Sequence, residues 1–455
     1  MHKIKLSGFQ LQVLISLCMY MGLLLLGFTI SWSGPMIPKL QDLDQSPLSH
    51  KLTDTQVSLT GSLLYIGSIP GSYLVGWLSN FKGRKPCLLL GSLISMIGYI
   101  LLLTTRNVPM LFIGRLLTGF SVGCIFLVVF VYLGEIASTS RRGTLLAIAG
   151  IFSTLSSMSL FSSATFFSYR GTTSVGLTFN IIFILGLLMI PESPMFHVLK
   201  GDDNAVKKTL QDLDRLDDLE KLIAAKQDYR TISNIKDWRD LFTLRNNRKA
   251  LFRLTSINIF QQCSGVMAIM FFFPRIFELS GSKIEGNLGM IIIGCFQLMG
   301  STVTPIFIEK IGRKVILTMS CAICSLSMFT LGLYFYLLDI ENPGIQNVHW
   351  LPLVVLIFFF LGFDSGLAII PSVLIGEMFT PNVRSCGSTL TITVSGLIGF
   401  LVTIVFGTIV NKVGPFVPFW FFSCTSALAF LFTIFFIPET KGKSLLEIQM
   451  DLGKK

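Results

Sequence analysis

The sequence predicts an all-α membrane protein with twelve transmembrane helices arranged as two six-helix bundles. Three observations predict this class: an apolar composition, twelve apolar runs of spanning length, and a set of motifs that recurs in both halves of the chain. Hydrophobic residues make up 52% of the chain and charged residues only 13%, whereas soluble domains carry about 25% charged residues. The mean hydropathy is +0.71. Since a bilayer span needs about 20 apolar residues, a chain of this composition supplies many spans.

The apolar runs form two groups of six on either side of a polar stretch. The first group is Gly8–Ile30, Leu59–Ser79, Cys87–Thr105, Met110–Leu133, Gly143–Phe167 and Ser174–Ile190. The second group is Phe252–Phe273, Leu288–Ile308, Val315–Leu338, Leu351–Ile375, Cys386–Val410 and Phe416–Ile437. We therefore expect one bundle at 1–191, a soluble helical linker at 192–249 with an amphipathic helix at Ala205–Leu219, a second bundle at 250–440, and a tail at 441–455.

The net charge of +11 would suggest a nucleic-acid partner for a soluble protein. Here the basic residues gather at the ends of the apolar runs, so the positive-inside rule accounts for them and we expect no nucleic-acid partner. The basic clusters that lie on one side of the membrane in a twelve-span arrangement are Lys82–Lys85, Arg141–Arg142 and Lys310–Lys314. We therefore expect both termini and the linker to lie in the cytoplasm.

The sequence offers no catalytic or metal-binding pattern. All nine cysteines lie in the apolar runs or at their ends, and no CxxC is paired with a second one, so neither a zinc site nor a disulfide framework is indicated. There is no Walker loop and no nucleophile elbow. The first apolar run is followed by no small-residue cleavage pattern, and we interpret it as an uncleaved helix. We expect no enzymatic activity, no cofactor and no metal.

Three motifs that follow spans in the first half recur in the same order in the second half. Each follows the corresponding span: Gly83-Arg84-Lys85 and Gly312-Arg313-Lys314, Glu135 with Arg142 and Glu377 with Arg384, and Pro191-Glu192 and Pro438-Glu439. Parallel six-helix repeats are typical of transporters whose ligand site lies between the halves. The repeat therefore indicates transport.

Two adjacent glutamines, Gln261 and Gln262, lie inside the apolar run Phe252–Phe273. Burying an amide without a hydrogen-bond partner costs about 2–7 kcal/mol, so these side chains are expected to face the bundle or a wet cavity. One interpretation is a polar ligand held near the middle of the membrane. The other is that the amides bond to neighbouring helices and hold them together.

The repeated motifs are part of a longer ordered set. Besides the repeats, it comprises Ser31-Trp32-Ser33-Gly34-Pro35, Gly114-Arg115, Tyr132-Leu133-Gly134-Glu135, Pro191-Glu192-Ser193-Pro194, Asn247-Arg248-Lys249-Ala250, Gln261-Gln262-Cys263-Ser264-Gly265 and Pro438-Glu439-Thr440-Lys441-Gly442. Over nearly its whole length the chain resembles the sugar porter family of the major facilitator superfamily, and within it the insect facilitated trehalose and hexose transporters. The resemblance implies the major facilitator fold.

The resemblance also implies a substrate site with several departures from the family pattern. Gln261, Gln262 and Gln297 match sugar-contacting positions, and we expect Phe272 to line or seal the cavity. Three positions differ from the pattern: Met267 replaces an asparagine, Gly150 replaces a glutamine, and Ser372 replaces the tryptophan that packs on the sugar ring. The pattern leaves the identity of the sugar open.

A second set of residues matches family positions that form ion pairs between helix ends when the carrier faces outward. This expected gate consists of Arg84, Glu135, Arg142, Glu192, Glu309, Arg313, Glu377, Arg384 and Glu439. Exposed ion pairs are worth about 0–1 kcal/mol each, so such an interface can close and still separate readily. The alternative is that the basic members only set topology.

We therefore expect a facilitative transporter of a sugar or similar polyhydroxylated solute, working by alternating access as a monomer in the plasma membrane. One alternative is a non-transporting sugar sensor on the same fold. The other is a proton-coupled carrier that uses Asp364, an acid inside a span. The resemblance favours uncoupled transport. Proton-coupled sugar porters usually carry an aspartate in the first span, whereas the corresponding stretch of this chain, Gly27–Ser31, has no ionisable group.

Overall fold

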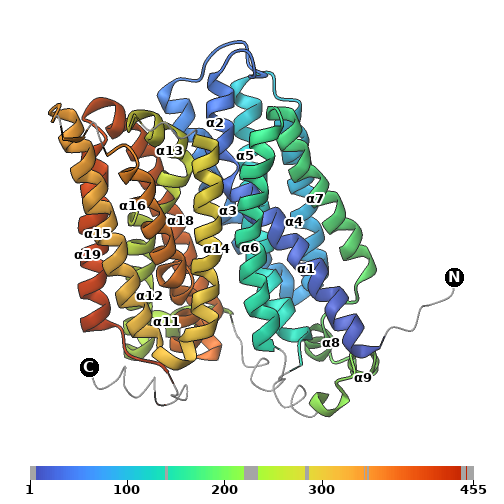
Figure 1. The fold of residues 1–455 in the computed structure, drawn as a ribbon. Coiled ribbons are helices and arrows are strands. Elements are labelled where there is room, and N and C mark those ends of the chain that lie inside the picture. Colours follow the sequence, from blue (N-terminus) through green and yellow to red (C-terminus); the bar gives the residue numbers. More distant parts are fainter. Residues whose placement is uncertain are drawn as a thin grey trace.

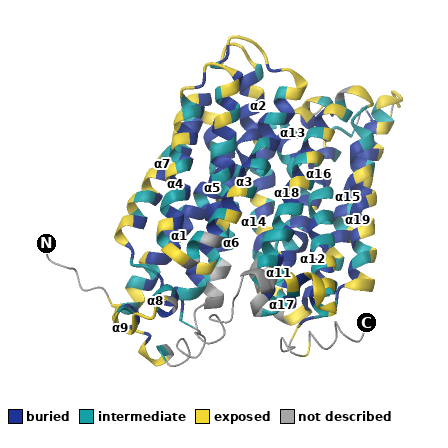
Figure 2. Ribbon diagram, turned by 180° about the vertical axis from the view of Figure 1, so that it is seen from behind, coloured by how far each residue is buried: buried dark blue, intermediate teal, exposed yellow. Residues whose placement is uncertain are grey.

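The structure, a computed structural model, describes residues 7–138, 142–219, 234–281, 286–342, 344–345, 348–441 and 447. Within these residues the regular elements are all helices, and they form two bundles that stand side by side (Figure 1). Buried residues gather inside each bundle, and exposed residues face outward (Figure 2). The chain matches the predicted class of an all-α membrane protein.

The N-terminal bundle consists of α1 (Gly8–Ser31), α2 (Ser33–Gln41), α3 (Asp54–Lys82), α4 (Arg84–Leu103), α5 (Val108–Ile136), α6 (Arg142–Phe166) and α7 (Tyr169–Met189). The linker carries α8 (Pro194–Lys200), α9 (Asp203–Asp212), the 3₁₀ turn η1 (Leu216–Asp218) and α11 (Asn234–Thr243). The C-terminal bundle consists of α12 (Arg245–Cys263), α13 (Val266–Leu279), α14 (Gly286–Ile311), α15 (Arg313–Asp339), α16 (Leu351–Gly362), the π turn η3 (Phe363–Leu367), α17 (Ile370–Met378), α18 (Pro381–Lys412) and α19 (Phe416–Phe436).

Ten helical segments in the described residues are long and apolar enough to cross a membrane. The other two predicted spans correspond to α3 and α6, which are helical for 29 and 25 residues. Both helices are rich in serine, threonine and glycine, and these residues lower the apolar signal without ending the helix. The twelve predicted runs thus all correspond to helices.

The linker helices α8, α9 and α11 lie at one end of the molecule, which we call the linker end (Figure 1). The amphipathic helix expected at Ala205–Leu219 is shorter than predicted, because α9 ends at Asp212 and Asp214 adopts a left-handed conformation with φ of 56°. This turn docks onto the N-terminal bundle. Gln12 donates to the Leu213 carbonyl at 2.8 Å, and Arg215 donates to the carbonyls of Glu135 and Ile136 at 2.8 Å.

The two bundles meet along two helix pairs, α3 with α18 and α6 with α14. We call the α3–α18 contact the seam. Its helices run antiparallel, because Gly407 lies against Ser58 and Gly396 against Ile69. Side chains of α3 pack directly against glycines of α18. A Cβ added at Gly399 would lie 2.7 Å from the Tyr65 ring, and a Cβ added at Gly407 would lie even closer to the Ser58 hydroxyl. A side chain at either position would displace the group from α3 that lies against it. These two contacts lie in the half of the seam that is more distant from the linker end.

The same seam is looser toward the linker end. A Cβ added at Gly396 would lie 3.5 Å from Ile69, and one added at Gly76 would lie 4.0 Å from Thr389. At the opposite end of the molecule, α2 and α13 are in contact, and a Cβ at Gly34 would lie 2.6 Å from the Met270 carbonyl. The bundles therefore pack tightly at the end away from the linker and more openly toward it.

Candidate functional site

The candidate site lies where the predicted span Phe252–Phe273 is broken into two helices. The first helix, α12, ends at Cys263, and Gly265 then adopts a left-handed φ of 82° before α13 begins. That conformation favours glycine, and a side chain at Gly265 would also collide with the ring of Phe422. The break places Gln261 and Gln262 in the last turn of α12, inside the membrane-spanning segment.

Gln262 is bonded to hydroxyl groups from both bundles. The Tyr65 hydroxyl of α3 donates to Gln262 Oε1 at 3.1 Å, and Gln262 Nε2 donates to Ser395 Oγ of α18 at 3.1 Å. Gly399, one turn beyond Ser395, leaves room for this arrangement, because a Cβ there would lie 2.7 Å from the Tyr65 ring and 3.1 Å from Gln262 Oε1. The amide thus spans the seam between the bundles.

Gln261 has a different environment. Its Nε2 donates to the carbonyl oxygens of Leu367 and Ala368, at 2.8 and 3.2 Å. In a regular helix the Leu367 carbonyl would accept from residue 371, but Pro371 has no N–H group. The Ala368 carbonyl also lacks its regular donor, because the Ser372 N–H bonds to the Ile369 carbonyl instead. The Gln261 amide therefore supports the broken helix α16–η3–α17.

Gln297 of α14 and Asp364 of η3 form a second polar pair within the C-terminal bundle. Their side chains are neighbours, and Gln297 Oε1 and Asp364 Oδ2 are both buried without a partner in the described part of the chain. Gln297 also lines a cavity of about 10 Å³, together with Phe161 and Met270. This volume holds about one water molecule, so it is far smaller than a sugar.

The remaining predicted site residues are not among the hydrogen-bond partners of the glutamine amides. Met267 is half-buried against the core, and the Phe272 ring packs 5.3 Å from that of Phe406. Ser372 is exposed, and its side chain forms no hydrogen bond among the described residues. A Cβ added at Gly150 would meet no atom within 4 Å. The structure therefore joins Gln262 to Tyr65 and Ser395 but does not bring Ser372 into that cluster.

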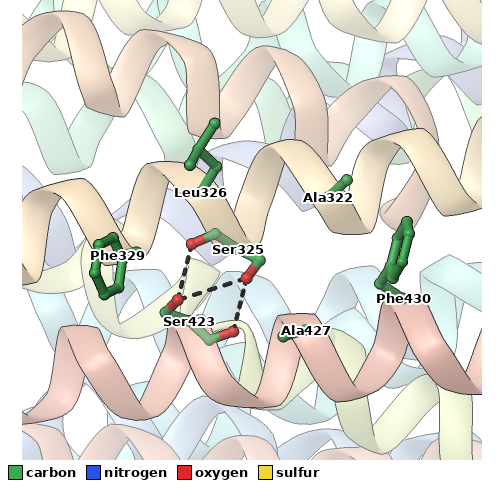
Figure 3. Close-up of a pocket in the computed structure, with 7 residues that line it drawn as sticks. All are labelled: Ala322, Ser325, Leu326, Phe329, Ser423, Ala427 and Phe430. Carbon is green, nitrogen blue, oxygen red and sulfur yellow. Dashed lines mark hydrogen bonds between the residues drawn. The ribbon is translucent and has the colours of Figure 1, made fainter.

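A larger hollow lies elsewhere, on the outer side of α15 and α19. Its volume is about 350 Å³, and it is lined by Ala322, Ser325, Leu326, Phe329, Ser423, Ala427 and Phe430 (Figure 3). Ser325 and Ser423 satisfy each other, each donating its hydroxyl to the other's carbonyl at 3.0 and 2.9 Å. Leu326 is 68% exposed, so the hollow opens away from the bundle. None of the predicted substrate residues lines it.

In the N-terminal bundle, the predicted gate residues connect the ends of α4 and α5. Arg84 pairs with Glu135 through two bonds, Nη2 to Oε1 at 2.8 Å and Nε to Oε2 at 3.1 Å. Glu192 accepts the backbone N–H groups of Arg84 at 3.0 Å and Lys85 at 3.1 Å. Its carboxylate therefore caps the first turn of α4, where the helix dipole favours negative charge.

The C-terminal bundle repeats this arrangement. Arg313 Nη2 lies 3.0 Å from Glu377 Oε1, and Glu439 accepts the backbone N–H groups of Arg313 at 3.0 Å and Lys314 at 3.1 Å. Gly312, at φ of 103°, leaves space for the cap, because a Cβ there would lie 2.5 Å from the Glu439 carboxylate. The repeated sequence motifs therefore form repeated helix caps and ion pairs, each within one bundle.

The structure shows no ion pair for the other predicted gate residues whose side chains it describes. Arg384 Nη2 donates to the Phe379 carbonyl at 3.4 Å, while Arg384 Nε and Glu377 Oε2 are buried without a partner in the described part of the chain. Arg384 and Glu377 are therefore not paired with each other among the described residues. The side chains of Arg142 and Glu309 lie outside those that the structure describes.

Arg115 is a buried cation in the core of the N-terminal bundle. It donates to the carbonyls of Thr60 at 3.0 Å and Thr29 at 3.1 Å, and its guanidinium lies 5.2 Å from the centre of the Trp32 ring. These acceptors are neutral. Arg115 therefore ties α5 to α1 and α3 through groups that do not change charge.

Sequence reasoning did not identify Tyr65 and Ser395 as site residues. Both are hydroxyl residues within predicted spans, but the spans contain many serines and several tyrosines. A hydroxyl in a helix can bond to its own backbone, as the Ser16 hydroxyl does to the Gln12 carbonyl. Position in the sequence therefore does not distinguish the two hydroxyls that meet Gln262 from the rest.

The family model described as "Sugar (and other) transporter" matches residues 15–452. Among curated relatives, the chain is 31% identical over 445 residues to the facilitated trehalose transporter Tret1 of Aedes aegypti, covering 96% of this chain and 54% of the relative. It is 30% identical to the Tret1 protein of Culex quinquefasciatus, covering 96% of this chain and 85% of the relative. The chain therefore spans about half the length of the first protein and most of the second.

Among solved structures, the xylose transporter XylE from E. coli in an inward open conformation superposes with a TM-score of 0.79 at 20% identity, covering 96% of this chain and 99% of that one. A partially occluded inward open form of the same protein gives a TM-score of 0.77 at 19% identity, covering 95% and 99%. At this identity the match concerns the fold, and it agrees with the predicted major facilitator fold.

Proposed function

The chain belongs to the sugar (and other) transporter family, and from this premise we propose that it is a facilitative carrier of a small polyhydroxylated solute, working by alternating access. The family and the named relatives are transporters, so the protein is not an enzyme. The relatives named for trehalose favour a sugar as the solute. We also propose that the carrier functions as a monomer.

One observation carries the proposal. Gln262 lies in a broken span, between the two bundles, and its amide bonds to two hydroxyl groups, those of Tyr65 and Ser395. A site that binds hydroxyl groups of the protein has the donor and acceptor geometry to bind hydroxyl groups of a solute. Ligand sites of this architecture lie near the middle of the bilayer at the interface of the repeats.

The seam between α3 and α18 supports alternating access. A carrier must close one end of its central site while the other end opens. The close contact at Gly399 and the looser one at Gly76 are what a carrier open toward the linker end would display. With the basic loops and the linker in the cytoplasm of a plasma-membrane protein, that end faces inward. Proteases or tag antibodies that reach the linker from outside intact cells would contradict this orientation.

The departures at Gly150, Met267 and Ser372 bear on which solute is carried. An open glycine and an exposed serine provide neither the extra amide nor the aromatic wall that the family pattern places there. A sugar site combines directed hydrogen bonds with an apolar wall. We therefore propose that this carrier binds its solute mainly through hydrogen bonds.

A second candidate function rests on Asp364. Its Oδ2 is buried without a partner in the described residues, and its neighbour Gln297 is neutral. An unpaired acid inside a membrane span is a candidate for carrying a proton. Proton-coupled transport through Asp364 is therefore the alternative to uncoupled transport.

The test is uptake of a panel of labelled sugars and polyols into proteoliposomes, together with binding to the purified protein. We expect uptake of at least one sugar, and Gln262→Ala should weaken its binding by about 1–3 kcal/mol, the cost of leaving a buried polar partner unmatched. Gln45→Ala, an exposed glutamine outside the bundles, is the control. Binding without uptake would favour the sensor alternative, and the absence of both would contradict the proposal.

A further inference from the structure

Tyr65 is the residue through which the N-terminal bundle touches the amide of Gln262. Its hydroxyl donates to Oε1 at 3.1 Å, and its ring rests on Gly399, where any side chain would displace it. On the other side of the amide, Ser395 comes from the same bundle as Gln262. Of the two hydroxyl partners, only that of Tyr65 crosses the seam.

The two hydroxyl groups bonded to Gln262 are the same kind of group that a polyol would present to it. A primary amide accepts through its oxygen and donates through its nitrogen, and a hydroxyl can do either. Two hydroxyls, one on each edge of the amide, satisfy Gln262 in the same way as two neighbouring hydroxyls of a sugar. The protein therefore holds its own substitutes for solute groups at this amide.

We propose that Tyr65 competes with the solute for Gln262. In the empty protein the Tyr65 hydroxyl donates to the amide oxygen, and a hydroxyl of the incoming polyol replaces the Tyr65 hydroxyl there. This inference deepens the proposed function and rests on it. Tyr65 is then a residue that sets affinity for the solute without having to contact it.

The competition also connects binding to the seam. Because Tyr65 and Gln262 belong to different bundles, displacing the tyrosine removes a direct hydrogen bond between the bundles. The loss occurs just where the seam changes from the close contact at Gly399 to the looser contact at Gly396. Solute binding at Gln262 therefore weakens a contact that opposes separation of α3 from α18.

The first arm of the test measures binding of the panel sugars to purified Tyr65→Phe. Phenylalanine keeps the ring on Gly399 and removes only the hydroxyl, so we expect binding to tighten by about two- to tenfold, the range for the net loss of one competing hydrogen bond. The same change in a Gln262→Ala background should leave affinity unaltered. Tyr73→Phe, on the same helix but 40% exposed, is the matched control. Unchanged or weaker binding by Tyr65→Phe would overturn the competition.

The second arm needs no solute. Thermal unfolding of the empty protein is measured for Tyr65→Phe, Gln262→Ala and the double variant, and we expect the two single effects to be non-additive, as for directly bonded residues. Additive effects alongside normal sugar binding would overturn the Tyr65 inference and leave the proposed function intact. Conversely, non-additive effects in a protein that binds and moves no panel sugar would contradict the proposed function, and the competition with it.

Discussion

Gln261 Nε2 lies 2.8 Å from the carbonyl oxygen of Leu367, the residue that Pro371 leaves without a helical donor. One side chain of α12 therefore completes the hydrogen bonding of a different span. This contact explains how the span from α16 to α17 can bend inside the membrane, where an unpaired carbonyl would have no water to bond. The neighbouring Gln262 bonds instead to hydroxyls on both sides of the seam, so the two adjacent amides have separate tasks.

We predict that Gln261→Leu destabilises the protein by about 1–3 kcal/mol, because the Leu367 and Ala368 carbonyls lose their shared donor. Thermal unfolding in detergent measures the loss. Adding Pro371→Ala restores an N–H group opposite Leu367, so the double variant should recover part of it. Gln45→Leu on the exposed loop should change stability by no more than about 0.5 kcal/mol. Equal stability of Gln261→Leu and the parent would mean that the amide is not structural.

We predict that Ser372→Trp tightens binding of hexoses. Ser372 is exposed, and its side chain has no hydrogen-bond partner among the described residues, so a larger ring displaces no such bond. An aromatic wall adds apolar contact with a sugar ring. Equilibrium binding of labelled hexoses is the measurement, and Ser174→Trp at an exposed position of α7 is the control. If affinity does not rise, the missing wall is not what limits sugar binding here.

We predict uncoupled transport. Arg115 is bonded to neutral carbonyls, and the first span offers no acid, so a proton has no binding group there. Proteoliposomes with an imposed pH gradient should bring solute to its equilibrium level and no higher, for the parent, for Asp364→Asn and for the exposed control Asp339→Asn. Accumulation above equilibrium that disappears only in Asp364→Asn would establish the proton-coupled alternative.

We predict that Glu439→Ala lowers stability by about 1–2 kcal/mol. Its carboxylate accepts the N–H groups of Arg313 and Lys314 and places a negative charge at the start of α15. The comparison is Glu278→Ala, whose carboxylate is 70% exposed in a surface pair with Arg275 and should contribute about 0–1 kcal/mol. Thermal unfolding of both variants is the measurement. A smaller effect for Glu439→Ala than for Glu278→Ala would contradict the capping role.

The predicted gate residues near the start of α4 and of α15 have corresponding partners in the two bundles. Gly83-Arg84-Lys85 recurs as Gly312-Arg313-Lys314, and the structure has matching ion pairs and helix caps at the two places. It does not pair Glu377 with Arg384, although both residues belong to the predicted gate. Whether two charges pair depends on the relative positions of helices, which spacing along one chain does not specify.

The helical membrane class and the repeated halves follow from local features of the sequence, because hydropathy over about 20 residues decides a span. By contrast, the break at Gly265 lies inside a run that the sequence predicted as one continuous span, and the structure revealed it. The contact of Gln262 with Tyr65, which is 197 residues away along the chain, results from tertiary packing. That contact depends on two bundles packing at Gly399, where the absence of a side chain lets a ring approach an amide. Such a fit results from three helices together, and no local pattern in any one of them encodes it.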